Sequence, residues 1–150
     1  GCGAVSVALA DPASLPAHAP RGEPPALEAT RALFKQMFHQ GVRYEQTGGV
    51  HAAALTDGRT LLEHAEDIGR HNAVDKVIGA ALLHGRAPEG LGLLVTGRIS
   101  AELAFKAARA GLAYVATPSV PSTLALTIAK RAGVLLVGRA GHPQFHRSDP

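Results

Sequence analysis

The chain has 150 residues, of which 46% are hydrophobic and 4% aromatic, with a formal net charge of +3 at pH 7. This length suits one domain with an apolar core, and the longest apolar runs, 90–96 and 133–138, are far shorter than the roughly 20 residues that cross a bilayer. Scattered basic residues predict no nucleic-acid surface, and a single cysteine excludes an internal disulfide and a zinc site of several thiolates.

The first part of the chain predicts a strand, a loop and a helix. Residues 1–10 alternate apolar and small side chains, as a strand does, and Cys2 stands at its start. Residues 11–25 hold five of the ten prolines, which favours a loop. From residue 26 to 40 apolar side chains recur every four positions, and Gly41 follows, so we expect a helix that ends there.

The middle of the chain predicts a hairpin followed by a helix. Residues 49–55 and 60–65 read as two strands joined by the turn at 57–58, an Asp-Gly pair. We expect Asn72 to cap the next helix, Asp75 to lie in its first turn and Gly85 to end it.

Strands and helices then alternate to the end of the chain. The expected order is a strand, a Ser-capped helix, a strand, a helix closed by glycine and a strand, at residues 91–96, 100–110, 114–117, 124–132 and 134–137. Such alternation predicts one α/β domain with a mixed, mostly parallel sheet covered on both faces. Ligands of such sheets bind at the carboxyl ends of the strands.

Four segments carry groups suited to ligand binding, each where a predicted strand meets a helix or a turn. In the first, two glycines precede a histidine on a strand of small residues, which leaves room for a ligand near the backbone. The same pattern also fits a bend followed by a core strand with a hydrogen-bonded histidine. The candidate binding residues here are Thr47, Gly48, Gly49 and His51.

The second segment, residues 67–76, concentrates two acids, two bases, a histidine and an asparagine at the start of a helix. A helix N-terminus beside arginine and lysine suits an anion. The alternative is an ordinary helix start whose basic residues are solvated. The candidate binding residues are Arg70, His71, Asn72, Asp75 and Lys76.

The third and fourth segments, 96–102 and 117–123, each follow a strand and open a helix. The third lacks the second glycine and the lysine of a Walker P-loop, so we do not expect a nucleoside triphosphatase. The fourth is rich in hydroxyls and stiffened by two prolines. Either segment also fits a plain capped helix. The candidate binding residues are Thr96, Gly97, Arg98 and Ser100 in the third and Ser119, Ser122 and Thr123 in the fourth.

These segments together resemble the successive motifs of the FdhD family, the formate dehydrogenase accessory proteins. They read TGGVHAAAL, GRHNAVDKVIG, TGRISAELAFKAARAG and PSVPSTLALTIAKRAGVLLVG. The resemblance implies a cytidine-deaminase-like, three-layer fold. The zinc ligands and the catalytic glutamate of deaminases are not expected, because His51 is followed by two alanines and residues 118–122 hold no cysteine.

The resemblance also implies a cytoplasmic sulfur carrier. In that family a cysteine desulfurase loads a persulfide onto a cysteine, which passes the sulfur to the bis-guanylated molybdenum cofactor, molybdenum bis(molybdopterin guanine dinucleotide), of formate dehydrogenase. Cys2 is the sole candidate here, since a thiolate is needed and two glycines leave it accessible. Family members carry a C-x-x-C pair. Either this chain is a single-cysteine variant, or the sequence begins inside the motif and lacks an N-terminal portion.

The resemblance further assigns cofactor binding to a stretch after the last strand, and it implies a homodimer. That stretch comprises Arg139, Ala140, Gly141, His142, Pro143 and Gln144. A non-catalytic chaperone that binds the guanine-containing cofactor, with Cys2 incidental, is the alternative function. Substitution of Cys2 separates the two hypotheses, because only the carrier needs the thiol.

Overall fold

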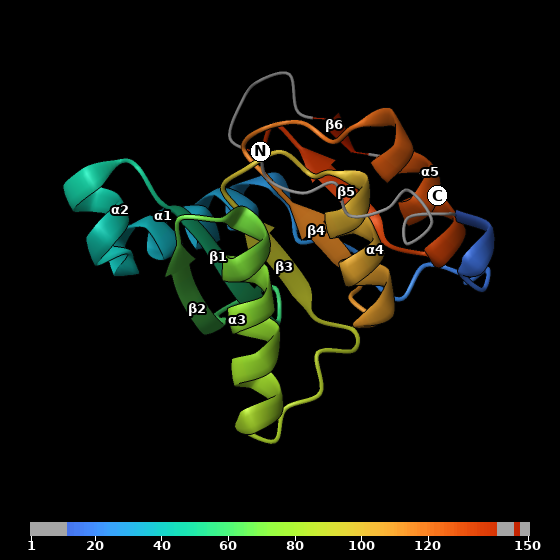
Figure 1. The fold of residues 1–150 in the computed structure, drawn as a ribbon, viewed down its shortest axis with the longest axis horizontal. Coiled ribbons are helices and arrows are strands. Elements are labelled where there is room, and N and C mark those ends of the chain that lie inside the picture. The colour runs from blue at the N-terminus through green and yellow to red at the C-terminus, as the bar shows by residue number, and fades with distance from the viewer. Residues whose placement is uncertain (1–11, 141–145, 148–150) are drawn as a thin grey trace.

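The computed structural model describes residues 12–140 and the backbone of residues 146 and 147. The predicted strand at residues 1–10, with Cys2, lies outside the described residues. The elements, in chain order, are η2 (Pro12–Ser14), α1 (Leu27–Gln40), α2 (Val42–Thr47), β1 (His51–Thr56), β2 (Leu61–Asp67), α3 (Arg70–Leu83), β3 (Gly92–Val95), α4 (Ala101–Arg109), β4 (Tyr114–Ala116), α5 (Thr123–Ala132), β5 (Leu135–Gly138) and β6 (His146–Arg147) (Figure 1).

The strands form one mixed sheet in the order β2-β1-β3-β4-β5-β6. Parallel pairing is confined to β3, β4 and β5, and the pairs β1–β2, β1–β3 and β5–β6 are antiparallel. The prediction of a mixed sheet is confirmed, but "mostly parallel" is wrong for the described pairings, because β1 enters the sheet between β2 and β3 in the opposite direction. Alternation of elements along the chain indicates the strands but not how they pair.

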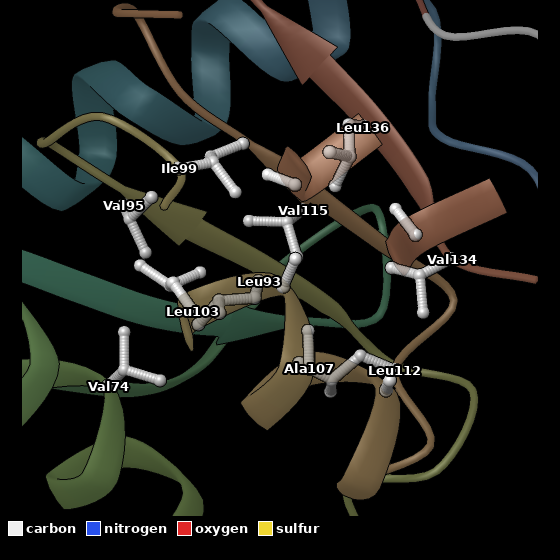
Figure 2. Close-up of a cluster of buried hydrophobic side chains, with 14 of the residues drawn as sticks. Val74, Leu93, Val95, Ile99, Leu103, Ala107, Leu112, Val115, Val134 and Leu136 are labelled. Atoms are coloured by element: carbon white, nitrogen blue, oxygen red, sulfur yellow. The ribbon is translucent and has the colours of Figure 1, made fainter. Parts of the chain in front are cut away.

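Helices cover both faces of the sheet, as predicted. One core lies between the sheet and the helices α3, α4 and α5, and the other lies between the sheet and α1. In the first, Leu93 and Val115 of the strands pack with Val74 and Leu103 of the helices (Figure 2). Residues 52–55 of β1, three alanines and a leucine, are all buried, so both faces of this strand are covered.

In the second half of the chain, the predicted Ser100 cap of α4 and the predicted Gly133 stop of α5 are confirmed, and Ser122, a predicted binding residue, is the cap of α5. The Ser100 hydroxyl accepts a hydrogen bond from the Leu103 N–H at 3.3 Å, and the Ser122 hydroxyl accepts one from the Ala125 N–H at 3.2 Å. Gly133 ends α5 in the left-handed conformation, at φ 68°. Both caps lie at strand-to-helix junctions, so they fix how the chain leaves the sheet edge.

The start of α3 differs from the prediction. Gly69 is the residue before the helix and Arg70 is its first residue, so Asn72 is not the cap and Asp75 lies in the second turn. The cause is Asp67, whose Oδ1 accepts hydrogen bonds from the Gly69 N–H at 2.9 Å and from the Asn72 side chain at 3.1 Å. These bonds shape the turn and start the helix earlier.

Besides η2, which lies in the predicted loop, two short elements were not predicted. Helix α2 continues from α1 after Gly41, where the sequence predicts a simple stop, and β6 pairs with β5 where a polar tail is predicted. Both are too short to show a periodic pattern. No helix in the described part of the chain is long and apolar enough to span a membrane.

Candidate functional site

The four predicted binding segments meet at one edge of the sheet. Strands β3, β4 and β5 end there, and β1 begins there because it runs antiparallel to β3. The register pairs His51, the first residue of β1, with Asp67, the last residue of β2. The start of α3 and the loops after β3, β4 and β5 therefore face the same side, as expected for a sheet of this class.

His51, Arg70 and Gly97 form the centre of this edge. His51 Nδ1 lies 3.2 Å from the Thr96 hydroxyl, which also accepts a hydrogen bond from the Ala52 N–H at 3.1 Å. A Cβ placed on Gly97 would lie 3.1 Å from Arg70 Cδ and 3.2 Å from His51 Cε1. Since glycine has no Cβ, three segments distant in sequence approach one another closely here.

Burial lowers the pKa of His51, and the positive charge of Arg70 lowers it further. Both effects disfavour the imidazolium form, so the ring is neutral at pH 7. A neutral imidazole has one donor and one acceptor nitrogen. With Nδ1 against Thr96, Nε2 remains to bond a ligand.

The first turn of α3 carries buried polar atoms that lack a partner among the described residues. These are Arg70 Nε and His71 Nδ1, and no side chain caps the first N–H groups of the helix. Burial lowers the pKa of His71 more than Glu102 raises it. We therefore treat the 3.5 Å approach of His71 Nε2 to Glu102 Oε2 as a contact of a neutral ring rather than an ion pair. Arg70 Nε is a donor, so an anion that paired it would relieve an unfavourable burial, whereas His71 Nδ1 of a neutral ring whose Nε2 faces Glu102 is an acceptor.

Two predicted binding residues of the same helix instead hold it in place. Lys76 Nζ lies 2.6 Å from Asp67 Oδ2 and donates to the Glu66 carbonyl at 3.1 Å, while Asp75 Oδ2 accepts from Lys106 Nζ at 2.6 Å. Lys76, the Gly69 N–H and Asn72 together lower the pKa of Asp67 to about 2. The charges of Asp75 and Lys76 are thus engaged within the fold. No pattern in the sequence indicates these ion-pair partners.

Thr117 organises the loops after β3, β4 and β5, although it was not among the predicted binding residues. Its hydroxyl donates to the Gly97 carbonyl at 2.7 Å and accepts from the Ser119 N–H at 3.0 Å. The Arg139 N–H donates to the Ser119 carbonyl at 2.6 Å, and the Ala140 N–H donates to the Thr117 carbonyl at 2.8 Å. Three loops are therefore tied together behind the edge.

We expect Thr117→Val to lower the free energy of unfolding by about 1–3 kcal/mol, because the half-buried Gly97 carbonyl and Ser119 N–H each lose a partner. Urea unfolding measures this change. Thr127→Val is the matched control, since Thr127 is exposed on α5 and bonds only within its own helix, and its effect should stay within about 0.5 kcal/mol. Equal effects of the two substitutions would contradict the role given to Thr117.

The remaining predicted residues fall into three groups. Thr47 and Gly49 bond to each other in the turn after α2, where Gly48 has φ 59°, so this turn uses their polar groups itself. Three predicted residues at this edge are exposed, namely Arg98, Thr123 and Arg139, and two of them are basic. Ser119 is partly exposed. The cysteine and the last part of the predicted cofactor stretch lie outside the described residues, namely Cys2, Gly141, His142, Pro143 and Gln144. Within residues 12–140, no group of three or more His, Cys, Asp or Glu side chains is placed to hold a metal ion.

Comparison with known proteins gives consistent results. The model of the FdhD/NarQ family matches residues 1–146. Relatives named sulfur carrier protein FdhD include those of Anaeromyxobacter sp. (strain K), 44% identical over 128 residues, and Bacillus subtilis (strain 168), 40% identical over 119 residues. Each alignment covers 79% of this chain but only 44% and 45% of the relative, so the chain spans less than half the length of these proteins.

A solved structure shows the same fold. It is the crystal structure of a formate dehydrogenase accessory protein from Desulfotalea psychrophila, which is 28% identical in sequence and superposes with a TM-score of 0.82. The match covers 97% of this chain and 61% of that chain. The similarity therefore extends over nearly all of the sequence.

Proposed function

Because the chain belongs to the FdhD/NarQ family, we propose that it acts in sulfur transfer during maturation of a formate dehydrogenase. The relatives' printed name, sulfur carrier protein FdhD, supports this role. The chain spans less than half of those relatives, so it contributes the part that carries Cys2 and the polar sheet edge. We further propose that its three-layer architecture is cytidine-deaminase-like and works without zinc.

The proposed chemistry is a thiol exchange at Cys2. The Cys2 thiolate attacks the terminal sulfur of a persulfide on a cysteine desulfurase, a new S–S bond forms on Cys2, and the desulfurase cysteine leaves as a thiolate. The S–S bond then breaks as the outer sulfur passes to the molybdenum of the bis-guanylated cofactor; this substrate supplies the two electrons that convert the sulfur to sulfide, and Cys2 is released as a thiolate. Cys2 is the sole cysteine in the sequence, so no second thiol of this chain can replace it.

The sheet edge supplies the binding groups for that cofactor in this proposal. This part of the proposal rests on the convergence of His51, Arg70 and Gly97, with the unpaired buried Nε donor of Arg70 at the start of α3. Donors at a helix N-terminus suit the phosphates of a guanylate arm. Arg98 and Arg139 are exposed near the same edge and add positive charge.

A cofactor chaperone is the second candidate. One observation favours it: His51 and Arg70 converge at Gly97, which gives the sheet edge polar groups suited to binding a ligand. In that case Cys2 is incidental and binding alone is the function. Both candidates predict a guanine nucleotide at the edge, and they differ only in the need for the thiol.

Titration calorimetry with GDP, which stands in for one guanylate arm, tests the binding site. We expect GDP to bind and ADP to bind at least about tenfold more weakly, and Arg70→Gln to weaken GDP about tenfold by removing a charge-assisted hydrogen bond. Arg31→Gln is the control, since Arg31 is exposed on α1, which covers the opposite face of the sheet. Equal binding of GDP and ADP, or an unchanged affinity in Arg70→Gln, would contradict the assignment.

A further inference from the structure

A cavity lies at the opposite end of the strands from the candidate site. It has a volume of about 230 Å³ and is lined by the loop at residues 22–25, the hairpin turn at 57–59, and the starts of β3 and β4. Tyr114 is the first residue of β4, whereas Thr117 of the candidate site directly follows the last. The two places are therefore separated by the length of the strand.

Tyr114 gives this cavity a buried polar group without a partner. The residue is only 3% exposed, and its hydroxyl has no hydrogen-bond partner among the described residues. The ring lies directly over Gly92, where any Cβ would meet the ring and its hydroxyl. Burial, with a smaller contribution from Asp57, raises the pKa of Tyr114 to about 12, so the hydroxyl keeps its proton and can donate.

The hairpin turn adds a second free donor. The Arg59 side chain is exposed, lines the cavity, and has no hydrogen bond or ion pair to any described residue. The neighbouring carboxylate of Asp57 is already occupied, because its Oδ1 accepts from the N–H groups of Arg59 and Thr60, both at 2.8 Å. The groups left unpaired around this cavity are thus donors, and one of them is cationic.

These observations favour an acceptor ligand of low charge. An unpaired buried hydroxyl is unfavourable and usually indicates a partner that is not part of the fold. Asp57 and Arg59 carry opposite charges beside this cavity, which suits a ligand of low charge better than a dianion such as phosphate. The cavity is also too small for a nucleotide-sized ligand of the kind proposed for the other edge.

We propose that this cavity binds a small monocarboxylate, with one oxygen on the Tyr114 hydroxyl and the other at the Arg59 guanidinium. This pairing uses both free donors and leaves the bonds of Asp57 intact. The site is independent of sulfur transfer, since none of its residues belongs to the edge that holds His51 and Arg70.

A titration with sodium acetate, followed by NMR, tests this proposal against sodium chloride at equal ionic strength. The amide signals of Gly58, Gly90 and Gly92, which line the cavity, report binding. In the unmodified protein we expect them to shift and saturate with acetate but not with chloride. A drift without saturation, or the same response to both salts, would overturn the proposal.

Two variants make the test specific. Tyr114→Phe removes the hydroxyl and keeps the ring over Gly92, so the protein should stay folded with an unfolding midpoint no lower than before. We expect it and Arg59→Gln each to weaken acetate binding at least about fivefold, as for the loss of one hydrogen bond. Arg31→Gln removes the same charge on α1 and should leave the affinity for acetate unchanged. An unaltered affinity in Tyr114→Phe would show that the hydroxyl takes no part.

Discussion

Gly92→Ala is expected to lower the free energy of unfolding by about 3 kcal/mol or more, which is at the upper end of the destabilisation that overpacking a protein core causes. The new Cβ would overlap Tyr114 Cζ and the hydroxyl oxygen, well inside the 3.0 Å below which real Cβ contacts essentially do not occur. The ring cannot move away easily, because Tyr114 is 3% exposed and packs within the core on the α1 side of the sheet. Urea unfolding with a two-state fit measures the change.

Two further variants identify the cause. Gly79→Ala is the control, since nothing lies within 4 Å of a Cβ at Gly79 in the interior of α3, and alanine there should stabilise by about 0.5–1 kcal/mol. Combining Gly92→Ala with Tyr114→Leu should cost less than the sum of the two single changes, because the clashing ring is gone. If Gly92→Ala were as stable as the parent, the ring would not lie where the structure places it.

Local signals along the sequence predicted the elements well. The Asp-Gly pair at 57–58 marks the hairpin, since the Asp57 carboxylate accepts hydrogen bonds from the backbone N–H groups of Arg59 and Thr60, and Gly58 takes a φ of 90°. Ser100 and Ser122 cap their helices for a similar reason, because the capping bond reaches only three residues. Such features depend only on neighbours in the sequence, so the sequence alone can predict them.

Features that depend on distant residues could not be predicted. Asn72 was expected to cap α3, but its side chain bonds Asp67 of the preceding strand. The approach of His51 and Arg70 across Gly97 needs three elements in one register, and nothing in the sequence specifies it. The same holds for the position of the Tyr114 ring over Gly92.

Cys2→Ala is expected to abolish acceptance of sulfur from a cysteine desulfurase while leaving the affinity for GDP unchanged. Sulfur acceptance is lost because the sequence contains no other thiol. The affinity for GDP is kept because the edge with His51 and Arg70 supplies the binding groups. Cys2→Ser, which keeps the size of the side chain but is a poor nucleophile for persulfide sulfur, should behave like the alanine variant. A chaperone without sulfur chemistry would support cofactor maturation equally well with either substitution.

The most direct measurement is the intact mass of the chain after incubation with a cysteine desulfurase and cysteine, without reductant. We expect the unmodified protein to gain the mass of one sulfur atom, which fragmentation locates on Cys2 and a reducing agent removes. We expect no gain in Cys2→Ala. An unmodified protein that binds GDP selectively yet gains no sulfur would contradict the carrier role and would favour the chaperone function instead.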